Sequence, residues 1–402
     1  MKHQPLAGYR VLDFCWMIAG PLGTRLLADL GAEVIKVESM ARLDAIREIG
    51  VQPPGMLTLD TNGVFNDCNT NKKSIQLNLG SADGIRIAKE LAAQSDVVTS
   101  NFTPDRMDRW GLGYDDLRAI REDIIVASLP VMGKEGPHRA WRSVGNGIIA
   151  MGGLNALTGF PNRAPVGLGT LHSDFTTPYF AALQIMAALH DRERTGQGQF
   201  IELAQYESAV HLLDTEILDY LVNGVDAERR GNRSLEHCPN GVFRCLGEDR
   251  WVAISVRDAD EWRALCELIG LADLGTRHDL QTLEGRRKLE PKLEALIEAW
   301  TVSRDRWEVA AALHARGVPA AAVEDVADLV DGDPDLRDAF ERVAHPAGVD
   351  ILLQHEPITW DGARLPIQRA PFFGEHTASV FNDLLGIDED ALADLVAAGV
   401  VQ

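Results

Sequence analysis

The first part of the chain alternates between strand-like and helix-like apolar spacing. Residues 9–14 form a short apolar run of the kind found in buried strands, and residues 32–38 are the next predicted strand. Between them, residues 22–30 carry apolar side chains at helical spacing. Pro21 suits the first helical position and Gly31 the C-terminal cap. This order predicts a βαβ unit with two parallel strands.

The same alternation continues along the chain. Ser81 can cap a helix that ends at Ala93. Strands that alternate with helices predict an open α/β fold around a parallel sheet. The further elements predicted here are strands at 96–98, 123–128 and 199–203 and helices at 115–120, 178–192 and about 206–221.

The character of the sequence changes near residue 225. Residues 241–245 and 250–256 read as a β-hairpin around the turn at 247–249. Amphipathic helices are predicted at about 259–269, 284–300 and 304–316, and a final helix at about 388–398. We therefore expect a large domain from residues 1–222 and 334–402, and a small α+β domain from residues 223–333.

Composition and charge narrow the classes of partner. The chain has 402 residues and a formal net charge of −21, which disfavours nucleic acid and anionic membranes as partners. No apolar run has the length of a membrane span, and the N-terminus lacks the pattern of a signal peptide. We expect a cytoplasmic protein. A phosphorylated ligand would require a local basic patch.

The common metal and nucleotide motifs are missing from the sequence. The five cysteines include no C-x-x-C pair, and the histidines show no ligand spacing, so we expect neither disulfides nor a metal. Cys15 lies in an apolar run and is expected in the core. Gly20 and Gly23 alone do not make a dinucleotide fingerprint, so NAD binding is not expected.

Several separated motifs resemble those of one enzyme family. Residues 11–38 look like the opening of class III CoA-transferases, the formyl-CoA transferase and carnitine CoA-transferase-like family. Further matches are Asn71-Lys-Lys-Ser-Ile75, Asn101-Phe102, Met107-Asp-Arg109, Gly111-Leu-Gly113, the Arg192–Gln199 turn, Arg369-Ala-Pro371 and Gly374-Glu-His-Thr377. They span nearly the whole chain in the family's order.

The resemblance implies both a fold and a reaction. Members have a Rossmann-like large domain built from both termini and a small inserted domain, and they form dimers of interlocked rings. They move CoA between an acyl-CoA thioester and a small free carboxylic acid, with the thioester as substrate and without a permanently bound cofactor.

The resemblance carries the nucleophile of the family onto Asp174. A carboxylate can attack a thioester carbonyl to give a mixed anhydride, which CoA then converts into an enzyme thioester. The alternative is a structural role, because Asp174, Thr176 and Thr177 all suit the start of a helix before Pro178.

The CoA-binding roles of the family fall on several other positions. Arginine suits phosphate because guanidinium binds it with two parallel hydrogen bonds. Lys72 and Lys73 could add to the same basic patch. For each cation the alternative is an ordinary surface charge, and for Phe102 it is the core. The residues carried over are Leu77, Asn101, Phe102, Arg109 and Arg142, with backbone contacts from Met17 and Ile18.

The chain also departs from formyl-CoA transferase. Arg142 is followed by Val144-Gly145 where that enzyme has a Tyr-Glu pair, and the small domain lacks its run of glycines. Trp16 replaces a histidine and is expected to line the acyl pocket. These differences argue against formate or oxalate and favour a larger or more apolar acyl group.

Three alternatives remain open from the sequence. An α-methylacyl-CoA racemase needs a G-H-D motif near residues 142–144, which read Arg-Ser-Val here, and His172 does not match that position. CoA transfer between two carboxylates of one acid would use the same Asp174. The chain could also be a non-catalytic CoA-binding subunit of a heteromeric transferase.

Overall fold

The computed structural model describes residues 4–50, 52 and 58–402. The chain forms two compact units. The first comprises the residues up to Asn155 together with Gly167–Asp226 and Asp338–Gln402, and the second comprises Ala156–Val166 and Ala227–Arg337. The boundaries expected from the sequence lie at 222/223 and 333/334. The second unit also contains Ala156–Val166, which the sequence assigned to the large domain.

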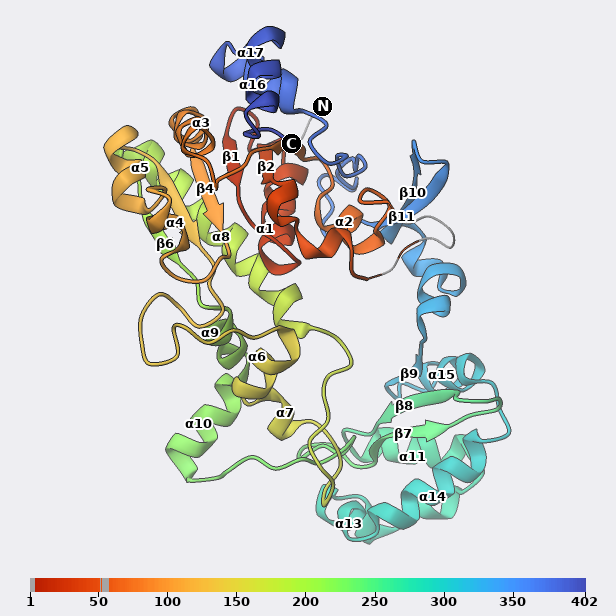
Figure 1. The fold of residues 1–402 in the computed structure, drawn as a ribbon. Helices are drawn as coiled ribbons and strands as arrows, with labels where there is room; N and C mark the ends of the chain where they lie inside the picture. Colours follow the sequence, from red (N-terminus) through yellow and green to blue (C-terminus); the bar gives the residue numbers. More distant parts are fainter. Residues whose placement is uncertain (1–3, 51, 53–57) are drawn as a thin grey trace. The chain divides into compact units, whose positions relative to one another are not determined.

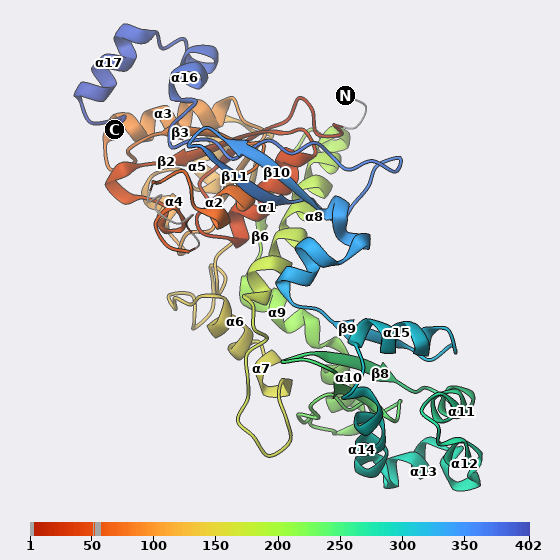
Figure 2. The same ribbon diagram turned by 90° about the vertical axis from the view of Figure 1, so that its right-hand side faces the viewer.

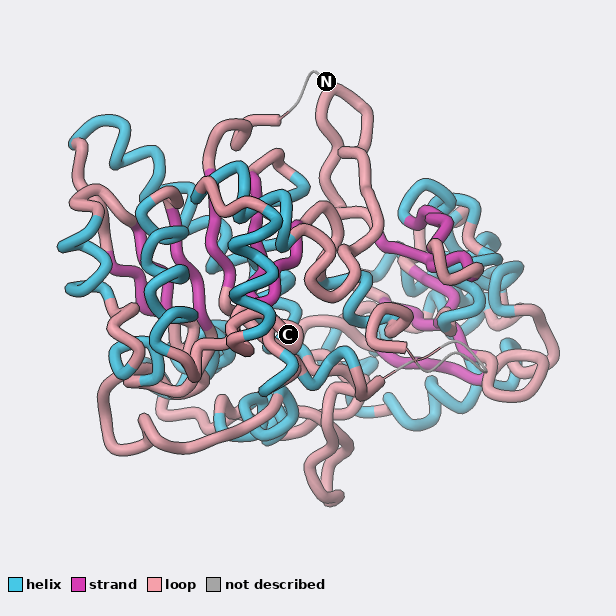
Figure 3. Tube along the Cα trace, turned by 45° about the horizontal axis from the view of Figure 1, so that its top comes forward, coloured by secondary structure: helices cyan, strands magenta, loops and turns pink. Residues whose placement is uncertain are grey.

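A six-stranded sheet in the order β3-β2-β1-β4-β5-β6 organises the first unit (Figure 3). Every neighbouring pair in it is parallel. The central register aligns Leu12 with Ile35 on one side and with Val98 on the other. The strands are β1 (Arg10–Asp13), β2 (Glu33–Glu38), β3 (Lys73–Gln76), β4 (Val97–Ser100), β5 (Ile125–Ser128) and β6 (Phe200–Glu202).

Helices pack on both faces of this sheet. Buried side chains of α1 (Ala19–Asp29) and α8 (His172–Thr195) share a core with β1 and β5. Those of α3 (Ala82–Ala93), α5 (Tyr114–Ile120) and α16 (Thr377–Leu385) form the core on the other face. Figure 2 shows α1 beside α8 and α16 beside α3, in agreement with the contacts between these helices. The mixed α/β class expected from the sequence is therefore correct.

Local chemistry explains two of the helix boundaries. The Ser81 side chain accepts a hydrogen bond from the backbone N–H of Gly84 and caps α3, as the sequence predicts. At the end of α8, Gly196 adopts a φ of 70°, the left-handed conformation that glycine takes without a steric penalty.

Helix α8 begins earlier than expected. The sequence places its start at Pro178, whereas the helix starts at His172 and contains Pro178 in its interior. Proline has no N–H to donate to the carbonyl of Asp174, four residues earlier, and the helix continues across this missing bond. The expected helix at 206–221 is also divided, into α9 (Gln205–Val210), a 3₁₀ turn at His211–Leu213 and α10 (Asp214–Asn223).

The C-terminal segment returns to the edge of the parallel sheet at β3. The backbone N–H of His376 donates to the carbonyl of Ser74, and that of Asn78 donates to the carbonyl of Val400. The first unit, seen in Figure 1, also contains the antiparallel pair β10 (Phe340–His345) and β11 (Val349–Gln354). Its remaining helices are α2 (Gly63–Cys68), α4 (Arg106–Arg109), α6 (Gly145–Met151) and α17 (Glu389–Ala397), while α7 (Leu154–Leu157) lies where the chain passes into the second unit.

The second unit is built on an antiparallel sheet of three strands. Its strands β7 (Asn240–Arg244) and β8 (Trp251–Ser255) form the expected hairpin, and β9 (Ala320–Val323) pairs with β8. Trp262 is the largest buried side chain of its core. The expected helix at 284–300 is broken at Leu289. The helices are α11 (Ala259–Leu268), α12 (Ala272–Thr276), α13 (Leu283–Lys288), α14 (Glu290–Thr301) and α15 (Arg306–His314).

Candidate active site

A cavity of about 650 Å³ opens at the carboxyl ends of four neighbouring strands. Its walls include residues that directly follow β1, β2, β3 and β4, and so it lies where the order of the sheet reverses between β1 and β4. Open parallel sheets bind ligands at this point, because the connections from the two strands diverge there and leave a crevice. The lining residues that follow these strands include Phe14, Trp16, Met17, Ile18, Ser39, Leu77, Asn78, Asn101 and Phe102.

The loop after β1 is held by side chains from two other loops. The backbone N–H of Trp16 donates to Asn101 Oδ1 at 2.8 Å, and Asn101 Nδ2 donates to the carbonyl of Trp16 at 2.8 Å. The N–H of Met17 donates to Asp44 Oδ1 at 3.0 Å. Met17 has a φ of 64°, a conformation that is costly for a residue with a side chain. These bonds hold the loop in that conformation at the cavity wall.

Buried ion pairs lie directly beneath this loop. Asp13 Oδ1 accepts the N–H of Cys15 at 2.9 Å, while Asp13 Oδ2 lies 3.2 Å from Lys72 Nζ. Lys36 Nζ donates to the carbonyl of Cys15 at 2.7 Å and pairs with Asp44 Oδ2 at 3.0 Å. Burial acts to raise the pKa of Asp13, but Lys72 and Lys36 outweigh it and the pKa is lowered. Asp13 therefore carries its charge inside the core.

Three aromatic rings form one continuous wall of the cavity. Phe102 meets Trp16 edge-on, with ring centroids 5.0 Å apart, and meets Trp110 edge-on at 5.7 Å. The guanidinium of Arg42 lies 5.5 Å from the Trp16 ring centroid, and that of Arg106 lies 5.5 Å from the Trp110 ring centroid. All five side chains line the cavity, so this aromatic wall is flanked by positive charge at both ends.

Asp174 contributes a carboxylate to the same cavity from the first turn of α8. Gln205, at the start of α9, is buried and donates from Nε2 to Asp174 Oδ1. Gly145 faces the other oxygen, because a Cβ built at Gly145 would lie 3.1 Å from Asp174 Oδ2 and 2.8 Å from Leu171 Cβ. Only glycine leaves this side of the carboxylate uncrowded.

The partly buried position of Asp174 raises the free energy of its ionised form. Burial raises the pKa of the Asp174 carboxyl group, and the hydrogen bond from Gln205 acts in the opposite direction. The net result is a raised pKa, so the group is a stronger base and nucleophile than a solvated aspartate.

The charges around the cavity are locally positive although the chain is strongly acidic. Arg42, Arg106 and Arg142 line it, against Glu38 and Asp174. The charge of Glu38 is balanced by Arg47, which donates hydrogen bonds to both carboxylate oxygens at 2.8 and 2.7 Å. Three guanidinium groups then face a single unpaired carboxylate. Such a lining favours a ligand that carries several negative charges.

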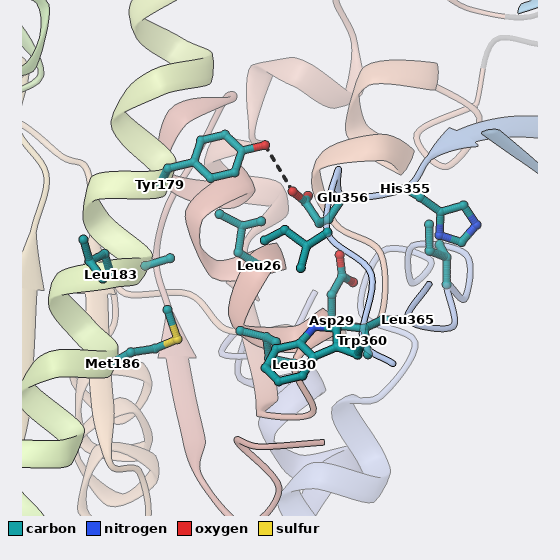
Figure 4. Close-up of a pocket in the computed structure, with 13 residues that line it drawn as sticks. Leu26, Asp29, Leu30, Tyr179, Leu183, Met186, His355, Glu356, Trp360 and Leu365 are labelled. Atoms are coloured by element: carbon teal, nitrogen blue, oxygen red, sulfur yellow. Dashed lines mark hydrogen bonds between the residues drawn. The ribbon is translucent and has the colours of Figure 1, made fainter. Parts of the chain in front are cut away.

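A second, smaller cavity of about 110 Å³ lies on another side of α8. Apolar side chains of α1, α8 and the segment 355–367 form most of its wall, and Figure 4 shows Tyr179 pointing toward Glu356. Tyr179 Oη donates to Glu356 Oε2 at 3.1 Å. Burial raises the pKa of Glu356, and Arg25 only partly opposes this effect. None of the residues expected at the active site lines this cavity.

Comparison with known proteins decides the family. The sequence profile of CoA-transferase family III matches residues 6–377. The chain belongs to this family. It is therefore an enzyme of the class III CoA-transferases, as the sequence motifs indicate.

Relatives of this family III chain align along nearly its whole length. Succinyl-CoA–D-citramalate CoA-transferase of Chloroflexus aurantiacus is 32% identical, with 99% of this chain and 98% of the relative covered. The succinyl-CoA–L-malate CoA-transferase beta subunit of the same organism is also 32% identical, with the same coverage. Among solved structures, a CAIB/BAIF family protein from Brucella suis superposes with a TM-score of 0.86 at 30% identity, covering 95% of this chain and 100% of that protein.

The cavity of this family III enzyme brings together most of the residues singled out from the sequence. Arg109 is the exception, since it is exposed on α4 and is absent from the described lining, whereas Arg106 of the same helix is present. The expected residues that do line the cavity are Trp16, Met17, Ile18, Leu77, Asn101, Phe102, Arg142 and Asp174.

Two expectations about individual side chains are wrong, and one structural alternative is excluded. Lys72 is buried against Asp13, and Lys73 pairs with Glu33 at 2.6 Å, so neither lysine joins the basic lining. Asp174 is not the N-cap of α8. That position is Leu171, and the Asp174 side chain is bonded to Gln205 instead.

Sequence reasoning missed the lining residues Arg42, Arg106 and Gln205. Arg42 and Arg106 flank the matched motifs without belonging to them, and no local pattern separates them from surface arginines. Gln205 is 31 positions from Asp174, and only the packing of α9 on α8 brings the two together.

Within the described residues, no group of three or more His, Cys, Asp or Glu side chains could hold a metal ion. None of the described helices combines the length and apolar character needed to cross a bilayer.

Proposed function

We propose that this enzyme moves CoA from an acyl-CoA thioester to a small free carboxylic acid through covalent intermediates on Asp174. The observation that supports this proposal is a half-buried carboxylate with a raised pKa that opens into a large, positively charged cavity. Burial limits the access of water, and an acylated aspartate survives only where water is kept away.

The reaction would begin with attack of Asp174 Oδ2 on the thioester carbonyl. The carbon–sulfur bond breaks, CoA thiolate leaves, and a mixed anhydride forms on the enzyme. The thiolate then attacks Cγ of Asp174 and releases the first carboxylate, leaving CoA bound to the enzyme as a thioester. The incoming carboxylate reverses these two steps and leaves as a new acyl-CoA.

The cavity suits the CoA portion of the substrate. CoA carries phosphates and a planar adenine, and the lining offers guanidinium groups and an aromatic wall. We propose that Arg42, Arg106 and Arg142 bind the phosphates and that the backbone of Met17 and Ile18 contacts CoA. Leu77, Asn101 and Phe102 retain the CoA-binding roles inferred from the family. For Arg109 that role now requires a movement of its exposed side chain.

Trp16 is the proposed determinant of the acyl group. Its ring lines the cavity beside the backbone of the loop after β1 and lies under Arg42. The apolar face of an indole suits a larger or more apolar acyl group than formate. The names of the relatives add succinyl-CoA as a donor worth testing.

We also propose a homodimer and a cytoplasmic location. Large apolar side chains of α8 and α10 are exposed in the single chain, among them Leu183 at 56%, Leu221 at 71% and Val222 at 75%. Large apolar side chains that are exposed in the single chain are candidates for a protein interface. Light scattering on the purified protein would give the oligomeric state.

Covalent trapping tests the main proposal. The pure protein is incubated with formyl-, acetyl- and succinyl-CoA, treated with hydroxylamine or borohydride, and digested for mass spectrometry. We expect modification of the Asp174 peptide with the true donor and none in Asp174→Ala. If no thioester modifies Asp174 but the α-proton exchanges in heavy water, the chain is a racemase and the proposal is wrong.

A role within a heteromeric transferase is the second candidate. It is favoured by one observation, since a relative with 32% identity is named as a beta subunit. Transfer activity of the purified single chain would exclude it. The racemase has less support, because none of the described residues lining the cavity is a histidine that could serve as a second base.

A further inference from the structure

Two hydrogen bonds, one helical turn apart, fix α9 against α8 beside the nucleophile. Gln205 donates to Asp174, and Thr177 and Ser208 share a hydrogen bond of 2.6 Å between their hydroxyl oxygens. Residues three apart on a helix lie on the same face, so both pairs belong to one interface. Ser208 also donates to the carbonyl of Gln205 at 2.7 Å, and the N–H of Gln205 donates to the carbonyl of Pro130 at 3.1 Å.

This arrangement gives the two oxygens of Asp174 different surroundings. Among the described residues, Gln205 is the only hydrogen-bond donor to the carboxylate, and it binds Oδ1. Oδ2 accepts no hydrogen bond from a described residue, and it faces Gly145, whose missing side chain leaves it uncrowded. Oδ2 is therefore the oxygen that is free to attack, and Oδ1 is the oxygen that stays on the enzyme as a carbonyl.

We infer that Gln205 is a catalytic residue that stabilises the oxyanion formed on Oδ1 of Asp174. This inference rests on the proposed function. When CoA thiolate attacks Cγ of the mixed anhydride, the electron pair of the Cγ=Oδ1 bond moves onto Oδ1. Collapse of the adduct restores this bond, breaks the Cγ–Oδ2 bond, and releases the first carboxylate together with Oδ2.

The same oxyanion forms a second time in each cycle. The incoming carboxylate attacks Cγ of the enzyme thioester, charge again builds on Oδ1, and the carbon–sulfur bond breaks. The two other steps occur at the carbonyl of the acyl group and place their charge on the acyl oxygen. Gln205 therefore assists the steps at the aspartyl carbon. Its buried amide is held by packing and backbone bonds before the charge develops, which is the condition under which such a donor is effective.

A matched pair of variants tests this role. Gln205→Met keeps the length and volume of the side chain but removes the donor. Gln199→Met is the control, because Gln199 Nε2 also donates to an aspartate of α8, Asp191, at 2.6 Å, and Gln199 does not line the cavity. Enzyme and acyl-CoA are mixed without acceptor, quenched at intervals, and the CoA-bearing Asp174 peptide is counted by mass spectrometry.

We expect Gln205→Met to form the enzyme–CoA thioester about 10²–10³-fold more slowly than the wild type, the range measured for loss of one oxyanion donor. The affinity for acyl-CoA, measured by calorimetry, should stay within a few-fold, and Gln199→Met should behave as the wild type. Equal rates of thioester formation in Gln205→Met and wild type would overturn the inference. A wild type that never modifies Asp174 would instead overturn the proposed function, so the two failures are distinguishable.

A second variant decides the matter if Gln205→Met does not fold. Gln205→Glu keeps the shape of the side chain but can donate to Oδ1 only when it is protonated. Its rate of thioester formation should rise as the pH falls from neutral, until Asp174 itself is protonated, whereas the wild-type rate should only fall because Asp174 must be ionised to attack. The same pH dependence in Gln205→Glu and wild type would show that no donor is needed at this position, and the inference would be wrong.

Discussion

Removal of the buried Lys72 charge is the sharpest test of how the active-site loop is supported. Lys72 Nζ lies 3.2 Å from Asp13 Oδ2, and it donates to the carbonyl of Pro21, to Thr24 Oγ1 and to Asn69 Oδ1 at 2.8–2.9 Å. Neither member of the ion pair has any exposed side-chain surface. Lys72→Met keeps most of the aliphatic stem and leaves the Asp13 carboxylate buried without its cation.

The expected cost follows from that burial. Removing one partner of a buried ion pair destabilises a protein by about 3–5 kcal/mol, because the remaining charge is neither solvated nor paired. The adjacent Lys73 is the control, since it is 39% exposed in its pair with Glu33. Lys73→Met should cost no more than about 1 kcal/mol. Against a total stability of about 5–15 kcal/mol, the difference between the two variants is large.

The pH dependence gives an independent check. In the wild type the folded-state pKa of Asp13 is lowered, so its contribution is present above the unfolded pKa and is lost as the pH falls through the folded pKa. In Lys72→Met the pKa of Asp13 should be raised, so stability is lost as the pH rises through it. The cost of Lys72→Met should therefore be greatest near neutral pH and should shrink in acid.

Urea denaturation at several pH values measures both quantities. Asp13→Asn combined with Lys72→Met should recover part of the loss, because the uncompensated charge is gone while one oxygen still accepts the N–H of Cys15. A cost for Lys72→Met that matches Lys73→Met, or that stays constant with pH, would refute the reasoning.

Three further predictions follow from the cavities. Arg106→Met should weaken CoA thioester binding, measured by calorimetry, by about 10–100-fold, which is the range for one hydrogen bond to a charged group. Arg109→Met should leave this affinity unchanged if Arg109 stays outside the cavity. Gly145→Ala should reduce the modification of Asp174 in the trapping assay, because the added methyl group would crowd Oδ2. It should also lower the free energy of unfolding by about 1–3 kcal/mol. A fully active variant would contradict this prediction. Glu356→Gln should raise the melting temperature more at neutral than at acidic pH. The reason is that the raised folded-state pKa of Glu356 makes the wild type lose stability as the pH rises. A gain in melting temperature that is independent of pH would contradict this prediction.

The sequence predicts the parallel sheet well where a local signal is strong. The apolar run of β1 and the cap at Ser81 depend on neighbouring residues, and they appear nearly where expected. β3 was not predicted, because Lys73–Gln76 is four residues long and contains a single apolar side chain. The start of α8 was misplaced because proline is favoured in the first turn of a helix, and this preference outweighed the weaker helical signal of the residues before it.

The active site shows a similar division. The resemblance named Asp174 by its place before the long helix, and it named others that line the cavity, such as Asn101 and Phe102, within matched motifs. The burial of Lys36 and Lys72 could not be read from the sequence, because a lysine is normally exposed and each has a partner on another segment. The same holds for Gln205. The hydrogen bond from Gln205 to Asp174 depends on the contact between α8 and α9, and no local sequence pattern predicts that contact.

The ion pairs beneath the loop contribute geometry more than stability. A buried pair can often be replaced by apolar residues of similar size with little loss of stability, because the cost of desolvation disappears together with the attraction. In this enzyme, however, Lys36 and Asp44 also bind the carbonyl of Cys15 and the N–H of Met17. Apolar residues cannot replace these two bonds, which hold Met17 at its φ of 64°.

The double variant Lys36→Met with Asp44→Leu separates the two contributions. We expect a midpoint of urea denaturation between those of Lys36→Met and the wild type, and an affinity for acyl-CoA that is at least about tenfold lower, equal to about 1.4 kcal/mol of binding free energy. The single variant Lys36→Met serves as the comparison, because it leaves Asp44 charged and should lose stability as well. If the double variant binds acyl-CoA as tightly as the wild type, the loop keeps its conformation without these charges. The ion pairs would then not be needed to hold the loop that lines the cavity.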